Sequence, residues 1–212
     1  MTQPVPKIAG AIIAGGKSSR MQQDGVAGDK FLLPLGKQPI IAHVAERLLA
    51  QLDTVFINAN REMPILDTLP CDVVRDSFSA CGPLAGILAA IQAAQDHQFL
   101  VTVAADTPFF PADLVARLVA RQAETQVPII LAQSNARLHP LFGLWRTDLA
   151  GALNRWLESS ASKSVLAFAM HIGFESAVFP LLQLGEETYD PFFNINHRAD
   201  YIEAQRLQKV MT

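Results

Sequence analysis

Short apolar runs alternate with segments of helical periodicity along most of this chain, and this alternation constrains its fold more than any other feature. The run 8–14 is apolar, the segment 40–52 has apolar residues at helical spacing, and a second apolar run follows at 54–59. Consecutive βαβ units of this kind predict an α/β fold with a mostly parallel sheet.

The rest of the chain continues the pattern. We expect further strands at 71–74, 99–105, 127–132 and 176–179, and further helices at 84–94, 111–123, 149–157, 165–170 and 198–210. The run 99–105 is apolar on both faces, as is typical of a central parallel strand. Pro111 and Asp113 are typical of a first helical turn and are expected to open their helix. No repeat or linker divides the sequence, which predicts one domain over 1–212.

The composition limits the function. Hydrophobic residues make up 50% of the 212 residues and the formal net charge is −3, so a large core can form and nothing favours binding to nucleic acid. The sequence shows no signal peptide and no apolar stretch long enough for a membrane span, so we expect a cytoplasmic protein without membrane contact. The 2 cysteines and 5 histidines lack metal-ligand spacing, so no structural metal is expected.

The first apolar run leads directly into the paired glycines Gly15 and Gly16, which hydroxyls and cations follow. In an open α/β sheet, ligands collect at the carboxyl ends of strands, and glycines let backbone N–H groups approach phosphate or base edges. Lys17, Arg20 and Lys30 could then neutralise phosphate charge. A tight turn between strand and helix remains the alternative for a Gly-Gly pair alone.

Two better-known phosphate loops do not match this stretch. A P-loop requires G-x-x-x-x-G-K-[ST], but here Gly16 intervenes between Gly15 and Lys17, so the register differs by one residue. The dinucleotide fingerprint G-x-G-x-x-G is absent as well. The sequence therefore disfavours an ATP-hydrolysing P-loop enzyme.

The segment 13–21 reads I-A-G-G-K-S-S-R-M, and D-K follows at 29–30 after a spacer. It resembles the L-A-G-G-x-S-x-R-M-G and D-K signature of the molybdenum cofactor guanylyltransferase family, within the glycosyltransferase-A-like nucleotidyltransferases. Ile13 replaces the leucine, and the spacer 22–28 is longer than usual, which leaves Lys30 less tightly tied to the loop. Further matches cover nearly the whole chain: Asn58-Ala59-Asn60, Arg75-Asp76-Ser77, Gly82-Pro83-Leu84-Ala85-Gly86, Asp106-Thr107-Pro108 and Asn194-Ile195-Asn196.

The resemblance implies a single-domain three-layer sandwich with a mostly parallel central sheet, Rossmann-like and similar to nucleotide-diphospho-sugar transferases. The N-terminal half would bind the nucleotide and the C-terminal half the acceptor. Because cytidylyl-transferring relatives tend to carry Ala-Ala-Gly, Gly15 favours guanine. The residues implied in nucleotide binding are Ile13, Ala14, Gly15, Gly16, Lys17, Lys30, Asn58, Asp76 and Asp106.

The implied reaction is attack by the terminal phosphate of molybdenum-carrying molybdopterin on the α-phosphorus of GTP, with release of pyrophosphate. Such a transfer requires alignment and positive charge but no protein nucleophile. The resemblance makes Arg20, Lys30 and Asp106 catalytic, and Mg²⁺ would bind Asp106 and Asn196. Local turn and strand-end hydrogen bonds are the alternative roles of Asp106, Asn58 and Asp76. Asn196 could equally brace the last helix.

The sequence gives few indications of which residues bind the acceptor. Arg137, His139 and Pro140 begin the C-terminal half, and the segment 159–164 with Lys163 could meet the acceptor phosphate, although a solvated loop and a strand cap are simpler interpretations. The loop 22–29 is expected to be mobile and to close over the nucleotide. Molybdoenzyme-maturation proteins are implied as partners.

Two other functions stay open at this point. An enzyme of the same fold could use another base or acceptor, as in cytidylyl transfer to molybdopterin or the synthesis of a nucleotide-sugar or a cobinamide derivative. A non-catalytic nucleotide-binding or partner-delivery subunit could also keep the fold, because fold alone does not confer activity.

Overall fold

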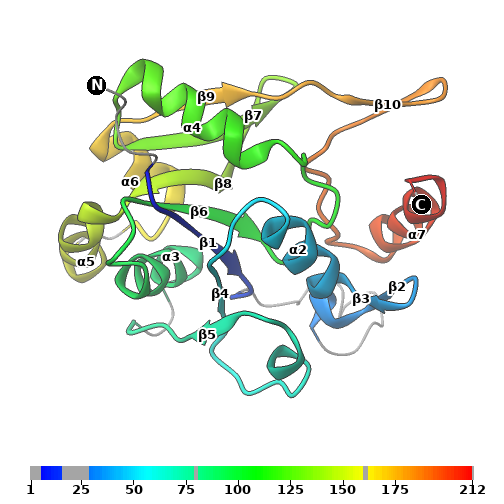
Figure 1. Ribbon diagram of the computed structural model, residues 1–212, viewed down its shortest axis with the longest axis horizontal. Coiled ribbons are helices and arrows are strands. Elements are labelled where there is room, and N and C mark those ends of the chain that lie inside the picture. Colours follow the sequence, from blue (N-terminus) through cyan, green and yellow to red (C-terminus); the bar gives the residue numbers. More distant parts are fainter. Residues whose placement is uncertain (1–5, 16–28, 79–80, 160–161, 212) are drawn as a thin grey trace.

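A seven-stranded sheet forms the centre of the molecule (Figure 1). The computed structural model describes residues 6–15, 29–78, 81–159 and 162–211. The strand order is β5-β4-β1-β6-β8-β7-β9. The strands are β1 (Ile8–Ile13), β4 (Val55–Asn58), β5 (Asp72–Val74), β6 (Phe99–Ala104), β7 (Ile129–Ser134), β8 (Arg137–Arg146) and β9 (Glu175–Val178). Within this sheet, as far as the chain is described, β8 pairs antiparallel with β6 and β7 while the other pairings are parallel, so the predicted mostly parallel sheet is confirmed.

Helices cover both faces of this sheet. On one face α2 (Ile40–Leu49) and α4 (Leu114–Thr125) share a hydrophobic core with Ile12 of β1. On the other face Ile13 packs in a second core with α3 (Pro83–Ala93), α5 (Ala150–Ser159) and α6 (Val165–Ile172). Successive strand residues point to opposite faces, so an apolar run buries both sides of β1. The predicted three-layer sandwich is confirmed.

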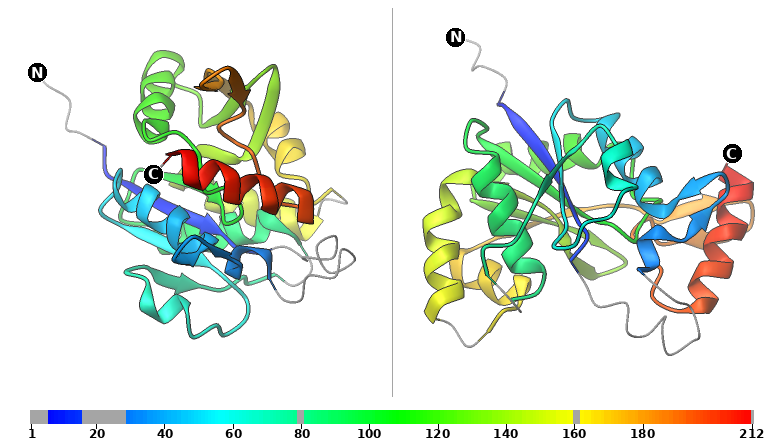
Figure 2. Two further views of the ribbon diagram at one scale, coloured as in Figure 1. Left: turned by 90° about the vertical axis from the view of Figure 1, so that its right-hand side faces the viewer. Right: turned by 90° about the horizontal axis from the view of Figure 1, so that it is seen from below.

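The C-terminal helix α7 (Arg198–Met211) lies beside an N-terminal hairpin (Figure 2). This hairpin pairs β2 (Pro34–Leu35) with β3 (Gln38–Pro39). The hydroxyl of Tyr201 donates a hydrogen bond to the carbonyl of Pro34 at 2.5 Å. The chain end is therefore attached to the segment that follows Lys30. The remaining short elements are the hairpin of β10 (Leu182–Leu184) and β11 (Glu187–Tyr189) and the 3-10 turns η1 (Lys30–Leu32), η2 (Leu66–Thr68) and η3 (Thr147–Leu149).

Gly10, in the middle of β1, permits close contact between the sheet and α2. A Cβ atom at this position would lie 2.8 Å from Cδ2 of Leu48 and 3.1 Å from Cδ1 of Leu52. Real carbon atoms do not approach so closely, so glycine lets these leucines rest directly on the strand. Gly10 is thus a packing residue inside a strand and does not belong to a phosphate loop.

The strand β8 is the main element that the sequence did not predict. It lies between β6 and β7 and runs antiparallel to both. Leu131 pairs with Gly143 whereas Ala132 pairs with His139, so the strand bulges around Pro140. Proline cannot donate a hydrogen bond to a neighbouring strand, but it is tolerated at bulges. Its presence in the sequence therefore argued against a strand here.

The start of α4 also differs from expectation. The helix begins at Leu114, so Pro111 precedes it and Asp113 occupies its N-cap position. Asp113 makes no side-chain cap; its carboxylate instead accepts a hydrogen bond from Nε of Arg117 at 2.6 Å. The prediction that Pro111 and Asp113 form the first helical turn is therefore wrong by about one turn. The other predicted helices and strands are confirmed, with small shifts at their ends.

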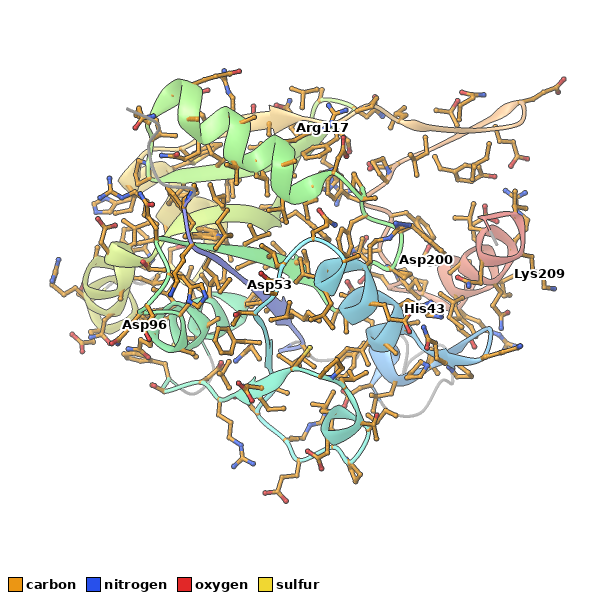
Figure 3. All side chains as sticks on the ribbon, viewed as in Figure 1. His43, Asp53, Asp96, Arg117, Asp200 and Lys209 are labelled. Atoms are coloured by element: carbon orange, nitrogen blue, oxygen red, sulfur yellow. The ribbon has the colours of Figure 1, made fainter. Side chains whose placement is uncertain are left out.

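Charged side chains such as Asp96, Arg117 and Lys209 lie on the outside of the molecule (Figure 3). Within the described ranges, no helix is long and apolar enough to cross a membrane.

We expect Ala136→Gly to stabilise the fold. Asn135 and Ala136, with φ angles of 45° and 59°, form the two-residue turn between β7 and β8. Positive φ costs alanine about 1 kcal/mol relative to glycine, so urea denaturation should show a gain of that order. The control is Ala120→Gly on the exposed surface of α4, which should lose about 0.5–1 kcal/mol. A loss of stability in Ala136→Gly would contradict this account of the turn.

Candidate active site

Parallel strands end side by side at one edge of the sheet and bring the predicted site residues together. Ile13, the last residue of β1, pairs with Asn58 in β4 and with Ala104 in β6. Neighbouring strands are about 4.8 Å apart, so the residues that leave these strands are close in space. Gly15, Asn58 and Asp106 consequently lie at the same carboxyl edge, within the reach of one ligand.

Lys30 joins two other predicted residues in a partly buried cluster. Its Nζ atom lies 2.5 Å from Oδ2 of Asp106 and donates a hydrogen bond to Oδ1 of Asn196 at 2.6 Å. The side chains of Lys30 and Asp106 are only 17% and 14% exposed. The hydroxyl of Thr107 donates to the other carboxylate oxygen of Asp106 at 3.2 Å. The fold therefore gathers one cation and two oxygen-bearing side chains from distant parts of the sequence.

Backbone contacts fix the segment that carries Asn196. The N–H group of Ile195 donates to the carbonyl of Asp106 at 3.0 Å, which joins this segment to the end of β6. The N–H groups of Asn196 and His197 donate to the carboxylate of Asp200 at 2.9 and 2.8 Å. Asp200 lies in the first turn of α7, so it caps the helix and holds the turn before it.

An ion pair holds the backbone immediately before Lys30. The carboxylate of Asp29 is 9% exposed and accepts two hydrogen bonds from Nη2 of Arg61, at 2.6 and 2.5 Å. Arg61 follows β4, so the pair attaches the end of the long spacer to the connection between β4 and β5. The Lys30 backbone is therefore anchored despite the length of that spacer.

Asn58, Asn60 and Asp76 form a polar network beyond the ends of β4 and β5. Nδ2 of Asn58 donates to Oδ1 of Asp76 at 2.7 Å, and Nδ2 of Asn60 donates to Oδ2 at 2.7 Å. The N–H group of Asp76 donates in return to Oδ1 of Asn60 at 2.9 Å. Asn58 is completely buried whereas Asp76 is half-buried, so a buried amide holds a carboxylate that stays partly accessible.

The side-chain oxygen of Asn58 lies between two glycines. A Cβ atom on Gly15 would be 3.5 Å from this oxygen, and one on Gly86 would be only 2.1 Å away. Within the described residues this buried oxygen has no hydrogen-bond partner, although an unpaired buried acceptor is costly. The Asn58 amide therefore fills a space between the glycine loop and α3 that leaves no room for a larger residue at Gly86.

A pocket of about 190 Å³ opens beside Asp106. Of the residues suggested for the acceptor, Arg137, His139 and Pro140 contribute to it, together with aromatic and aliphatic side chains. Its walls include Asp106, Arg137, His139, Pro140, Phe192 and Asn194. The pocket thus combines a carboxylate, a cation and a flat apolar surface next to the Lys30 cluster.

His139 is held in one orientation by its neighbours. Its Nε2 lies 2.7 Å from Oγ of Ser134, whose hydroxyl donates to Asp190 at 2.7 Å, and its ring stacks on Phe192 at a centroid distance of 4.5 Å. Because Ser134 has only one hydroxyl proton, Nε2 of His139 must be the donor in their contact. In a hydrolase triad, by contrast, the histidine lies between serine and aspartate and accepts the serine proton.

The electrostatic surroundings favour the neutral form of His139. Burial lowers the pKa of His139 below its ordinary value. The carboxylate of Asp190 opposes this shift, and the guanidinium of Arg137 adds to it. A neutral imidazole stacked on an aromatic ring can serve as a pocket wall without carrying charge.

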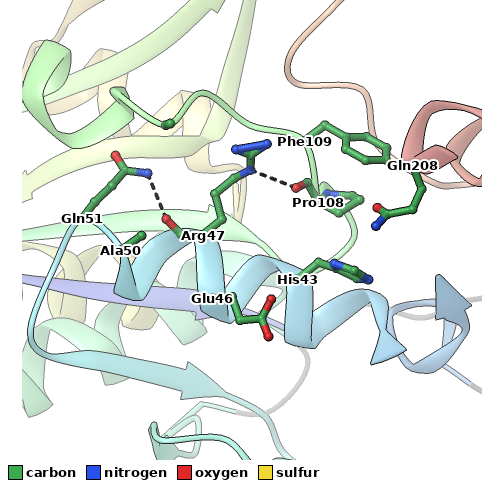
Figure 4. Close-up of a pocket in the computed structure, with 9 residues that line it drawn as sticks. His43, Glu46, Arg47, Ala50, Gln51, Pro108, Phe109 and Gln208 are labelled. Atoms are coloured by element: carbon green, nitrogen blue, oxygen red, sulfur yellow. Dashed lines mark hydrogen bonds between the residues drawn. The ribbon is translucent and has the colours of Figure 1, made fainter. Parts of the chain in front are cut away.

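Side chains of α2 and of the residues that follow it hold the segment after Asp106 by hydrogen bonds (Figure 4). Nε of Arg47 donates to the carbonyl of Pro108 at 3.2 Å, and Nε2 of Gln51 donates to the carbonyl of Pro111 at 3.3 Å. A separate pocket of about 370 Å³ lies beside these contacts, with walls that include His43, Phe109 and Gln208. It contains none of the residues predicted for the site, so we place the active site at the edge with Asp106.

The remaining predicted residues are Gly16, Lys17, Arg20 and Lys163. Gly16, Lys17 and Arg20 lie outside the described residues, as do residues 22–28 of the loop 22–29 that was expected to be mobile. Nζ of Lys163 donates to the carbonyl of Leu157 at 2.5 Å, near the end of α5. The described contact of Lys163 is therefore with the protein backbone.

Four further residues contact the site, although the sequence did not predict them: Arg61, Ser134, Asp190 and Phe192. Arg61 directly follows the Asn58-Ala59-Asn60 motif. Its position next to this motif could have indicated that it lies near the site. Asp190 and Phe192 precede the Asn194-Ile195-Asn196 motif, but nothing local indicates that they face β7 and β8.

Comparison with known proteins identifies the family. Residues 10–173 match the MobA-like NTP transferase domain. A molybdenum cofactor guanylyltransferase from Brucella ovis is 48% identical over 208 residues, which cover 97% of this chain and 94% of that protein. This chain belongs to the MobA-like NTP transferase family. The resemblance stated from the sequence is confirmed, and membership makes the chain a nucleotidyltransferase.

Solved structures share the fold of this MobA-like transferase at low sequence identity. Molybdopterin-guanine dinucleotide biosynthesis protein A from Archaeoglobus fulgidus has a TM-score of 0.70 and 18% identity, covering 95% of this chain and 98% of that one. A Mycobacterium tuberculosis protein solved in complex with manganese has a TM-score of 0.65 and 14% identity, covering 95% and 99%. The predicted fold class is thus confirmed by structure as well as by sequence.

We expect Gly86→Ala to destabilise the protein. The new methyl group would overlap the buried Asn58 amide, and overpacking of this kind costs about 1–3 kcal/mol in the free energy of unfolding. Urea denaturation measures the loss. The matched control is Gly151→Ala in α5, where the nearest atom is Nη1 of Arg155 at 3.5 Å and no loss is expected. Equal stability of Gly86→Ala and wild type would show that Asn58 has another position available.

Lowering the pH should reduce the free energy of unfolding of the wild type more than that of a His139→Gln variant. The folded-state pKa of His139 lies below its unfolded value of about 6.5, so the unfolded chain takes up the proton first. The stability associated with neutral His139 is complete above that pH and is lost as the pH falls toward the lower, folded-state pKa. Urea denaturation at pH 8 and pH 5 tests this difference. An equal loss in both proteins would show that His139 does not titrate on unfolding.

Proposed function

We propose that this chain transfers GMP from GTP to the phosphate of molybdenum-carrying molybdopterin, which forms the guanine dinucleotide cofactor and releases pyrophosphate. The proposal is supported by the match to the Brucella guanylyltransferase along almost the entire chain. It is also supported by the convergence of Lys30, Asp106 and Asn196 at the edge of the sheet where the glycine loop begins. We further propose that proteins which mature molybdoenzymes receive the product.

The nucleotide site that we propose extends from the glycine loop to Asp106. Ile13, Ala14 and Gly15 bring the first strand to this edge, and Asp76 presents a carboxylate that can accept hydrogen bonds from the base or ribose. Lys30 supplies positive charge where the phosphates would lie. The remaining contacts come from the signature residues Gly16, Lys17 and Arg20, as the family resemblance implies.

Mg²⁺ is the cofactor that we propose for the Asp106 and Asn196 pair. The two side-chain oxygens already converge on one cation, the Lys30 ammonium, at 2.5 and 2.6 Å. Mg²⁺ prefers oxygen ligands and accepts one or two carboxylates together with water and phosphate oxygens. In the described part of the chain, no group of three or more His, Cys, Asp or Glu could hold a metal, which suits such a sparse site. When bound, the ion would neutralise phosphate charge as a Lewis acid.

The pocket beside Asp106 is the acceptor site that we propose. Its aromatic and apolar walls, including Phe192 and neutral His139, suit a flat heterocycle, and Arg137 can pair with a phosphate. The pocket adjoins Asp106, so the acceptor phosphate could reach the α-phosphorus of a nucleotide on the other side. This arrangement gives nucleotide binding to the N-terminal half and acceptor binding to the C-terminal half of one domain.

No residue of the protein has to form a covalent intermediate in this reaction. The site has to hold the attacking oxygen, the phosphorus atom and the leaving group in line. Lys30 is placed to stabilise charge on the departing pyrophosphate, and the Ile195 and Asp200 contacts keep Asn196 in position.

Pyrophosphate release tests the proposal. With Mg²⁺, GTP and molybdenum-carrying molybdopterin, the wild type should release pyrophosphate, and Asp106→Ala should be slower by about 10²-fold or more. The matched control is Asp113→Ala, which removes an exposed carboxylate of the same size and should be as fast as wild type. Unchanged turnover in Asp106→Ala would contradict the role of Asp106. Faster release from CTP than from GTP would contradict the assignment of guanine.

A further inference from the structure

The ammonium of Lys30 occupies the position where Asp106 and Asn196 converge, at 2.5 and 2.6 Å from their oxygens. We infer that Lys30 is an internal counter-cation, which holds these oxygens until a divalent cation displaces it toward the triphosphate. The inference rests on the proposed metal site, and it gives Lys30 a second partner in addition to the phosphates.

Burial explains why Asp106 needs such a counter-cation. Its side chain is only 14% exposed, and a carboxylate in such a place is costly without a partner. Thr107 donates to Oδ1 at 3.2 Å, whereas Oδ2 contacts Lys30. The same ammonium binds the Asn196 oxygen, so one charge stabilises both side chains and the segments that carry them.

The two cations cannot share this position. A divalent ion such as Mg²⁺ binds oxygen at about 2.1 Å, so an ion on these two oxygens would lie almost where Nζ now lies. Two positive charges at such short range repel each other strongly. Binding of the metal ion at Asp106 and Asn196 therefore requires the Lys30 side chain to leave.

The backbone of Lys30 is held in place, so the displacement that we infer involves its side chain alone. The Asp29–Arg61 ion pair fixes the residue before it, and the turn η1 begins at Lys30 itself. A lysine has a flexible four-carbon stem, so Nζ can turn toward a phosphate without a change in the backbone. A bound triphosphate would offer the displaced ammonium a new partner. Metal and nucleotide would then favour each other's binding, and this coupling must be reciprocal.

Titration of the protein with Mn²⁺, followed by the electron paramagnetic resonance of the free ion, tests the inference without any turnover. In the absence of nucleotide, Lys30→Gln should bind Mn²⁺ about tenfold more tightly than wild type, because no charge-assisted hydrogen bonds have to be broken. The matched control is Lys37→Gln, an exposed lysine whose loss changes the net charge equally and should leave the affinity unchanged. Asp106→Asn should bind Mn²⁺ much more weakly.

Thermal unfolding supplies a second readout. Lys30→Gln leaves the Asp106 carboxylate without its cation, so Mn²⁺ should raise the melting temperature of this variant more than that of wild type. Lys30→Met keeps the aliphatic stem and serves as a second uncharged variant if the glutamine disturbs folding. An equal Mn²⁺-induced rise in wild type and both variants would contradict the displacement of Lys30.

The variants separate a failure of this inference from a failure of the proposed function. If Asp106→Asn loses Mn²⁺ while Lys30→Gln and Lys30→Met bind it no more tightly than wild type, the metal site stands and the counter-cation role is wrong. If Asp106→Asn binds Mn²⁺ as wild type does, both the metal site and the inference are overturned.

Discussion

The contact of the Lys30 ammonium with Asp106 and Asn196 is the interaction on which the rest of the site depends. It joins residues that are up to 166 positions apart in the sequence. Lys30 ends the signature motif, Asp106 follows the strand β6, and Asn196 precedes the helix α7, so three distant segments meet around one charge. A partly buried carboxylate tolerates few arrangements, because it must always have a cation or donors beside it. The requirement to neutralise Asp106 therefore constrains the segments that meet there.

Tight packing restricts the movement of the strands that carry this cluster. Leu48 rests on Gly10, and the Asn58 amide lies against Gly86 so closely that a Cβ atom there would overlap it. Because a well-packed interior does not deform easily, this packing resists relative movement of the strand ends. A reaction that works by alignment benefits from such a rigid edge, while the movable parts can be as small as one lysine side chain.

The antiparallel strand β8 forms part of the pocket that we propose for the acceptor. Without it, β6 would lie beside the parallel strand β7, and the β8 residues Arg137, His139 and Pro140 would not line a pocket with Asp106. The bulge at Pro140 and the turn at Asn135 and Ala136 bring Arg137 and His139 next to Asp106. The pocket thus forms where the parallel part of the sheet meets its antiparallel strand.

Local pattern in the sequence determined the helices, most of the strands, the glycine loop and the position of Asp106 at a strand end, because each depends on residues within a few positions of one another. The tertiary structure alone decided that β8 enters between β6 and β7, that Arg61 anchors Asp29, and that Lys30 reaches Asp106 and Asn196. Such contacts depend on strand order and chain return over long separations, which no local periodicity encodes.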